Sequence, residues 1–243
     1  MSQLELISFA SDRELAHAAA TAWLDAIEAA RRQDRSHLVA LSGGRIAKTL
    51  FAAMTEQART RNASLEHVHF FWADERCVPP QDAESNFAIA DQTLFQPLRL
   101  CPAQIHRLRG EDDPETAARA ATAELCRVAP LSPAGQPVLD LILLGMGEDG
   151  HVASLFPGSQ PTTLATAIYQ PVVAAKPPPR RLTLTYAVIH AAQEVWVLAS
   201  GSGKERALET SLASPHQTPL ATVIAGRQRT RIFTDINRKA SAG

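Results

Sequence analysis

The side chains best suited to catalysis lie within residues 139–159, LDLILLGMGEDGHVASLFPGS. Asp149 and His151 stand there in a loop framed by glycines, just after an apolar run that predicts a buried strand. Histidine is the side chain most easily used as a base near neutral pH. A lone histidine is more often structural, but this one lies beside acids at the end of a strand. We therefore expect His151 to be catalytic, with Asp149 next to it.

The same stretch matches a dinucleotide-binding fingerprint, because Gly145, Gly147 and Gly150 form G-x-G-x-x-G after the apolar run. That fingerprint also requires a helix to follow and an acidic residue about 20 positions later. Here Pro157 and Gly158 would interrupt such a helix early, and no acidic residue stands at that distance. We therefore expect no nucleotide cofactor.

Other catalytic arrangements find no support in the sequence. A G-x-S-x-G nucleophile elbow is absent. The H-x-x-x-H and C-x-x-C spacings of common metal sites are absent as well. The simplest chemistry is a water molecule activated by His151. We predict that this chemistry uses no metal ion and no cofactor.

Polar residues also follow three other apolar runs. They are the segment SGGR (Ser42, Gly43, Gly44 and Arg45) at the end of the run 37–42, the segment DERCVPP with Asp74, Glu75 and Arg76 after the run 67–73, and the segment SGSGK with Lys204 after the run 195–199. Ligands of open α/β sheets bind beyond the carboxyl ends of the strands. Any one of these segments alone would be taken as a turn, but four strand ends together favour a shared site.

Each of these segments keeps an alternative interpretation. Gly43 and Gly44 let the backbone approach an anion at a helix N-terminus, or they form a plain strand-to-helix turn. The guanidinium of Arg76 is suited to a phosphate or carboxylate, or it neutralises the neighbouring acids Asp74 and Glu75. The residues Ser85 and Asn86 that follow are typical of a helix cap.

Helical and strand patterns alternate along the whole chain. We predict helices over 12–33 (with Asp12 as the cap), 46–61, 85–95 (closed by Pro97), 113–128 and 203–213, and strands over 37–42, 67–75, 138–147, 194–200 and 230–235. Residues 181–193 fit either state, and 129–138 and 170–180 have the composition of loops. The alternation predicts a single α/β domain over residues 1–243: an open, mostly parallel, Rossmann-like sheet with helices on both faces.

Composition limits the possible partners of this chain. It has 243 residues with a net charge of −1, which gives no support to nucleic-acid binding. Its three cysteines form no pattern, as in proteins of reducing compartments. The N-terminus lacks a basic leader, and no run of about 18 apolar residues occurs. We expect a cytoplasmic protein without membrane contact.

Four segments together resemble one known family. DLILLGMGEDGHVASLFPGS closely resembles the signature of 6-phosphogluconolactonases, and WADERCVPPQDAESNF resembles their second motif. LSGGR and RLTLTYAVIHAAQEVWVLASGSGKERAL are similar to the first and last blocks of the family, in the same order. The resemblance covers residues 10–235 and implies the fold shared with amino-sugar-phosphate isomerases and deaminases.

The resemblance implies hydrolysis of 6-phospho-D-glucono-1,5-lactone to 6-phosphogluconate, a step of the oxidative pentose phosphate pathway. His151 would activate the water, and Asp149 would orient His151. Arg76, Arg181 and Lys204 would hold the phosphate, and N–H groups near Gly145 and Gly147, or a cation, would stabilise the oxyanion. The complete set of implied substrate contacts is Ser42, Gly43, Gly44, Arg45, Asp74, Arg76, Gly145, Gly147, Arg181 and Lys204. We expect a monomer acting on a small sugar-phosphate lactone.

The first block departs from the family pattern. The family has S-G-G-S-T-P where this chain has Ser42-Gly43-Gly44-Arg45-Ile46-Ala47. A hydroxyl pair and a helix-starting proline are therefore missing. We hypothesise that Arg45 compensates for the missing serine and threonine hydroxyls.

Two other functions remain as alternatives. Amino-sugar-phosphate deaminases share G-x-D-G-H but continue A-F-N-E-P, and here Phe156 stands in place of their glutamate. A catalytically inert sugar-phosphate sensor on the same fold would carry an added DNA-binding segment. This chain begins almost directly with its first predicted helix and keeps His151, so we favour the enzyme.

Overall fold

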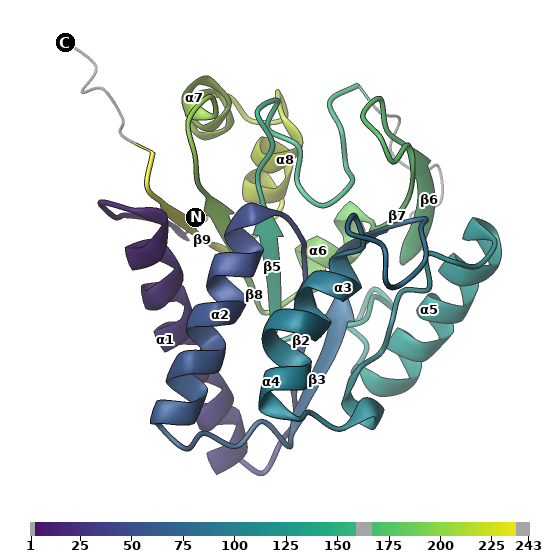
Figure 1. Cartoon of the computed structure of the whole chain (residues 1–243). Helices are drawn as coiled ribbons and strands as arrows, with labels where there is room; N and C mark the ends of the chain where they lie inside the picture. Colours follow the sequence, from purple (N-terminus) through teal and green to yellow (C-terminus); the bar gives the residue numbers. More distant parts are fainter. Residues whose placement is uncertain (1–2, 159–166, 237–243) are drawn as a thin grey trace.

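The computed structural model describes residues 3–158 and 167–236. Its centre is a six-stranded parallel sheet in the order β1-β9-β8-β5-β2-β3 (Figure 1). The strands are β1 (Gln3–Ser8), β2 (His37–Leu41), β3 (Val68–Trp72), β5 (Leu141–Gly145), β8 (Glu194–Ala199) and β9 (Arg229–Thr234). The central strands are buried along nearly their whole length, which explains why they are continuous apolar runs.

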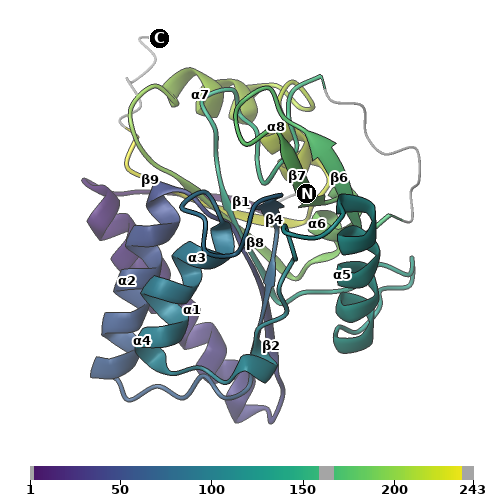
Figure 2. The ribbon, with the colours of Figure 1, turned by 45° about the vertical axis from the view of Figure 1, so that its right-hand side comes forward.

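Helices cover both faces of this sheet. Figure 2 shows α1 to α4 on one side of the sheet and α5 and α6 on the other. The helical elements are α1 (Asp12–Arg32), α2 (Arg45–Thr60), α3 (Asn86–Ala90), a π-helical turn (Asp91–Phe95), α4 (Gln96–Leu98), a 3₁₀ turn (Pro102–Gln104), α5 (Pro114–Val128), α6 (Tyr186–Ala191), α7 (Glu205–Ala213) and α8 (Pro219–Ala225). The predicted open, parallel α/β sheet with helices on both faces is confirmed. None of the described helices is long and apolar enough to cross a bilayer.

A second, antiparallel sheet lies beyond the main one. Its order is β4-β7-β6, from β4 (Asp74–Arg76), β6 (Tyr169–Val173) and β7 (Arg180–Leu184). The predicted strand 67–75 is therefore divided at Ala73, and its charged end belongs to a different sheet. The predicted loop 170–180 was wrong in part, because its first residues form β6. The ambiguous stretch 181–193 holds both a strand and a helix.

Several element ends differ from the sequence predictions. Ser11 caps α1, since its hydroxyl accepts the N–H of Glu14, and Asp12 is already helical. Pro97 was expected to close the helix 85–95, but it lies inside α4. Helix α3 ends at Ala90, and the π-helical turn separates it from α4. Strand β1 and helix α8 were not predicted. Both are short, and α8 begins with Thr218 as its cap and a proline in its first turn.

The topology creates a crevice between β2 and β5. The chain leaves β2 through α2 to reach β3 on one side, whereas the chain after β5 continues to β8 on the other side. The two strands are neighbours, pairing at Val39–Leu141 and Ala40–Ile142. Because their connections diverge, the loops at their carboxyl ends leave space between them. This edge of the sheet is where a ligand site is expected.

Candidate active site

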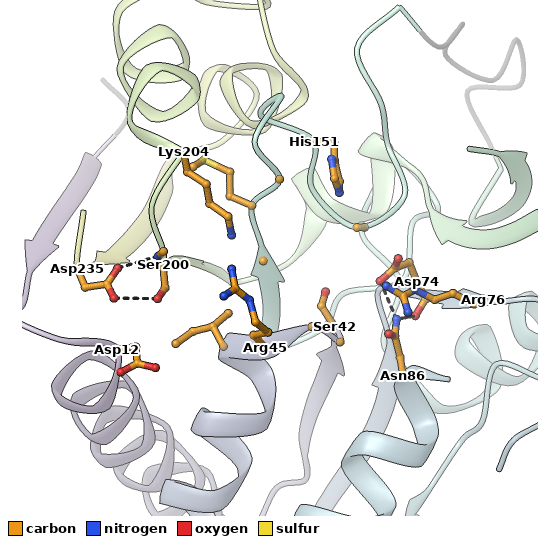
Figure 3. A pocket seen from close by; sticks show the side chains of 18 of the residues that line it. Asp12, Ser42, Arg45, Asp74, Arg76, Asn86, His151, Ser200, Lys204 and Asp235 are labelled. Atoms are coloured by element: carbon orange, nitrogen blue, oxygen red, sulfur yellow. Dashed lines mark hydrogen bonds between the residues drawn. The ribbon is translucent and has the colours of Figure 1, made fainter. Parts of the chain in front are cut away.

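A pocket of about 450 Å³ lies at this carboxyl edge. It is formed by the loops after β2, β5, β8 and β9 together with β4 and β7 (Figure 3). The residues lining it include His151 and every substrate contact predicted from the sequence: Ser42, Gly43, Gly44, Arg45, Asp74, Arg76, Gly145, Gly147, Arg181 and Lys204. Asp149 is outside this lining and contacts His151. The structure thus brings residues from distant parts of the chain to one cavity.

His151 and Asp149 form a hydrogen-bonded pair. Nδ1 of His151 lies 2.5 Å from Oδ1 of Asp149, and the backbone N–H of His151 donates to the same oxygen at 3.1 Å. We assign the Nδ1–H tautomer from this contact. Nε2 is then the basic nitrogen, on a ring that extends into the pocket (Figure 3).

The loop that carries this pair depends on Gly147. Its N–H donates to the carbonyl of His151 at 2.9 Å, which closes the loop. A Cβ at this position would lie 2.1 Å from Nδ1 of His151 and 2.8 Å from Oδ1 of Asp149. The glycine is therefore required by the close packing of the histidine ring.

Asp149 is held in its charged form. Burial raises the pKa of this carboxyl, but the hydrogen bonds and charge of His151 act against burial and leave the pKa below its ordinary value. The carboxylate on Nδ1 fixes the orientation of the imidazole ring and leaves Nε2 facing the pocket. The pair therefore has the geometry of a general base with its orienting acid.

Phe156 lies between the base and a cation. Its ring centroid is 4.8 Å from that of His151, and the guanidinium carbon of Arg181 is 5.6 Å from the same ring. This is the position where the deaminase pattern has a glutamate. An aromatic ring there supplies packing and no carboxylate.

Arg76 and Arg181 form one pair of cations. They are direct partners in the antiparallel ladder of β4 and β7. Burial, and then the charge of Arg76, lower the pKa of Arg181. Arg181 donates to the carbonyl of Pro178 at 3.0 Å, and Arg76 forms an ion pair with Glu84 at 3.3 Å. Two facing guanidinium groups at a cavity wall favour an anion.

Arg45 and Lys204 form a second pair. Figure 3 shows their tips approaching each other on the side of the pocket away from Arg76. Burial, and then the charge of Arg45, lower the pKa of Lys204, and Glu148 and Asp235 act in the opposite direction. Within residues 3–158 and 167–236, neither cation forms an ion pair. Gly44, the cap residue of α2, makes no side-chain cap bond, so the first N–H groups of this helix are open to a ligand.

The two acids beside Arg76 are bound by other groups. Glu75 accepts the backbone N–H groups of Arg76, Asn86 and Phe87 and the hydroxyl of Ser85. Burial raises the pKa of Glu75 to about 7, and those N–H groups act against burial. Ser85 is the cap of α3, as the sequence predicted. The alternative that Arg76 neutralises Asp74 or Glu75 is wrong, because its ion pair is with Glu84.

Sequence reasoning missed several residues of the pocket. Asp235, at the end of β9, accepts the hydroxyl of Ser200 at 2.9 Å and the N–H of Gly201 at 3.1 Å, which fixes the loop that leads to Lys204. Ser154, which is outside the pocket lining, donates to the lining residue Asp74 at 2.7 Å. The only sequence signal for Asp235 was its place at the end of the predicted strand 230–235. The same signal marked the polar segments after the other predicted strands.

The part of the chain that the structure describes contains no group of three His, Cys, Asp or Glu side chains placed to hold a metal ion. The side chains that line the pocket supply one imidazole, two pairs of cations, three carboxylates (Asp12, Asp74 and Asp235), and hydroxyl and amide groups.

Comparisons with known proteins support this picture. Residues 10–232 match the family model of glucosamine-6-phosphate isomerases and 6-phosphogluconolactonases. A 6-phosphogluconolactonase of Treponema pallidum (strain Nichols) is 38% identical over 180 residues, which cover 73% of each chain. One of Streptomyces coelicolor is 37% identical over 235 residues, 92% of this chain and 89% of that protein. The solved structure of 6-phosphogluconolactonase from Trypanosoma brucei superposes with a TM-score of 0.81 at 28% identity, covering 96% of this chain and 97% of that one.

Proposed function

The chain belongs to the family of glucosamine-6-phosphate isomerases and 6-phosphogluconolactonases, and on that premise we propose that it hydrolyses 6-phospho-D-glucono-1,5-lactone to 6-phospho-D-gluconate. This is a step of the oxidative pentose phosphate pathway. The observation that carries the proposal is the His151–Asp149 pair, which faces a pocket with cations on two sides. A lactone with a phosphate at one end and a reacting carbonyl at the other needs both features.

His151 acts as the general base in this mechanism. Its neutral Nε2 takes a proton from water as the water oxygen attacks C1 of the lactone. Asp149 stabilises the imidazolium that results. The tetrahedral intermediate then breaks the bond between C1 and the ring oxygen, and His151 returns the proton to that oxygen. The product is an open chain with a carboxylic acid at C1, which releases its proton to solvent and becomes the carboxylate.

The oxyanion at C1 is stabilised by the pair Arg76–Arg181. The N–H of Gly147 donates within its own loop, so it does not serve as the oxyanion donor expected from the sequence. The guanidinium of Arg181 and the imidazole of His151 both contact the ring of Phe156, so this cation is close to the proposed base. Preorganised cations are strongly stabilising where negative charge develops.

The phosphate binds at the other pair, Arg45 and Lys204. Arg45 begins α2, where helix N–H groups and the helix dipole favour an anion, and the tip of Lys204, the cap residue of α7, approaches Arg45 (Figure 3). Lys204 interacts with Arg45, whereas Arg76 interacts with Arg181. The three cations Arg76, Arg181 and Lys204 are therefore divided between two subsites, and Arg45 supplies phosphate contacts in place of the missing family hydroxyls.

Phe156 argues against amino-sugar deamination, because the ring packed on His151 replaces the acid which that chemistry uses. The presence of the hydrogen-bonded His151–Asp149 pair argues against an inert sensor. We also propose that residues 1–243 form one domain that acts as a cytoplasmic monomer on a small sugar phosphate and binds neither nucleic acid nor membrane. The net charge of −1 supports the absence of a nucleic-acid partner.

The test is a lactonase assay with freshly prepared 6-phosphogluconolactone, corrected for spontaneous opening, beside an assay for ammonia released from glucosamine 6-phosphate. We expect rapid lactone hydrolysis and no ammonia. Release of ammonia, or lactone opening at the background rate, would contradict the proposal.

A further inference from the structure

Three buried polar atoms of residues that line the pocket have no hydrogen-bond partner among the described residues. One is Nε of the cation Arg76, and the two uncharged ones are Oγ of Ser42 and Oδ1 of Asn86. Both side chains line the pocket, with 8% and 2% of their surface exposed. Buried polar groups are nearly always hydrogen-bonded in folded proteins. Two such atoms at the wall of one cavity therefore point to a ligand group that completes them.

The orientation of the Asn86 amide is fixed by its neighbours. Nδ2 donates to the carbonyl of Asp74 at 2.9 Å and to the carboxylate of Asp74 at 3.2 Å (Figure 3). The other carboxylate oxygen of Asp74 accepts the hydroxyl of Ser154. A rotated amide would place its oxygen against two oxygens of Asp74. The unpartnered atom of Asn86 is thus the carbonyl oxygen.

Gly43 lies next to both Ser42 and the amide of Asn86. A Cβ on Gly43 would lie 1.8 Å from Oδ1 of Asn86, so only a residue without a side chain fits against the amide. Ser42 directly precedes Gly43 at the end of β2. The buried amide oxygen of α3 and the hydroxyl after β2 therefore flank one glycine.

The chemistry of these atoms selects their partner. An amide oxygen only accepts hydrogen bonds, and the Ser42 hydroxyl both donates and accepts. Phosphate and carboxylate oxygens without protons would be repelled by the Asn86 oxygen. A sugar hydroxyl can donate to Asn86 and accept from Ser42 at the same time.

We propose that Asn86 and Ser42 form a subsite that recognises one ring hydroxyl of the lactone, at C2, C3 or C4. This rests on the proposed lactonase function. The subsite differs from the two cation pairs in its chemistry, because it selects the sugar by a hydroxyl and not by a charge. It also assigns Asn86 a role in substrate specificity beyond the first turn of α3.

The experiment is a double-mutant cycle between protein and substrate. Asn86→Ala and Ser42→Ala are assayed with 6-phosphogluconolactone and with its 2-deoxy, 3-deoxy and 4-deoxy analogues. A buried neutral hydrogen bond gives about a tenfold change in kcat/KM. We expect each variant to lose about that factor with the natural lactone. With one analogue, the same one for both variants, wild type and variant should differ by less than about twofold.

Ser85→Ala is the matched control. It disturbs the same helix terminus, because Ser85 caps α3, but its hydroxyl bonds to Glu75 and to the N–H of Ala88. Its effect should be equal with all four substrates. An equal loss with all four substrates for Ser42→Ala, or for folded Asn86→Ala, would overturn the hydroxyl subsite while leaving lactone hydrolysis by the wild type intact. If the wild type does not hydrolyse the natural lactone, the proposed function itself is wrong.

Discussion

The two edges of the parallel sheet use the same kinds of charged residues in opposite ways. At the amino edge, Arg35 pairs with Asp140 at 2.6 Å and Arg229 pairs with Glu194 at 3.0 Å. At the carboxyl edge, Arg45 and Lys204 form no ion pair within the described residues. The hollow at the amino edge, about 690 Å³, is even larger than the candidate pocket at the carboxyl edge, about 450 Å³. The size of a cavity therefore does not identify the site, whereas the cations Arg45 and Lys204, which form no ion pair within the described residues, mark one side of it.

The contrast has an energetic consequence. At the amino edge, cations bonded to other groups of the protein stabilise the fold, most of all where they are buried, and the loss of a buried one should lower the free energy of unfolding. Charges kept apart from acids in a pocket are costly in the free protein and become favourable when an anion binds. Variants at the carboxyl edge should therefore change activity, and variants at the amino edge should change stability.

The largest effect is expected at the base. His151→Asn keeps a polar side chain of similar reach but removes the basic nitrogen. General-base catalysis contributes roughly 10²–10⁴-fold, so kcat should fall by about that factor. Binding of 6-phosphogluconate, measured by calorimetry, should change little because the cations remain. A variant with near-normal kcat would move the base to Asp149 or Asp74.

The next effect tests the amino edge. Arg227 is buried, and its guanidinium donates to the carbonyls of Ile189, His190, Ala192 and Gln193, which end α6. Arg227→Met leaves these acceptors without donors, each costing about 1–3 kcal/mol where no water reaches it. We expect unfolding in urea to require about 3 kcal/mol less, with unchanged kcat per folded molecule.

Arg229→Met is the matched control for this edge. Its side chain is 47% exposed and its ion pair with Glu194 is screened by solvent. The change should cost under about 1 kcal/mol. An Arg227 variant as stable as this control would remove the structural role of the amino-edge cations.

The contrast also explains what the sequence could and could not predict. The strand ends, the Gly147 loop and His151 follow from local patterns, and the structure places them at one edge. The pairing of Arg76 with Arg181 is not local, because it depends on the register of two strands that are distant in the chain. Strand β6 contains Pro171 and precedes a proline-rich turn, so its composition resembles a loop. Asn86 has the pattern of a helix start, and only contacts with Asp74 and Gly43 reveal its free oxygen.

The third prediction concerns the cations of the pocket. Lys204→Met should raise KM about tenfold or more, since a charge-assisted contact contributes about 1.5–3 kcal/mol and the phosphate is bound alike in substrate and transition state. Stability should stay the same or rise, because a half-buried cation without an ion pair is removed. The same change at Arg76 should lower kcat instead, because the proposed mechanism assigns that pair to the oxyanion. Arg206→Met, an exposed cation of α7 outside the pocket, is the control with unchanged KM. Equal effects on KM at Lys204 and Arg76 would contradict the division into two subsites.

The smallest effect concerns His37, which begins β2 at the amino edge and is 3% exposed. Burial lowers its pKa to about 4, with Asp140 acting in the opposite direction and Arg35 in the same direction. In the unfolded chain the imidazole gains its proton near pH 6.5, whereas the folded protein binds it only near pH 4.

The unfolded state therefore binds more protons in this window, and stability falls as the pH drops from 6.5 towards 4. Glu75 acts in the opposite sense, because its raised pKa makes the folded state lose stability as the pH rises from 4.5 to 7. Comparison with His37→Gln cancels that contribution. Between pH 7 and pH 5.5 the wild type should lose about 1 kcal/mol relative to the variant in urea unfolding. Parallel pH profiles for the two proteins would show that His37 is protonated alike in both states. The amino edge would then carry a charge that is as accessible to solvent as those of the pocket.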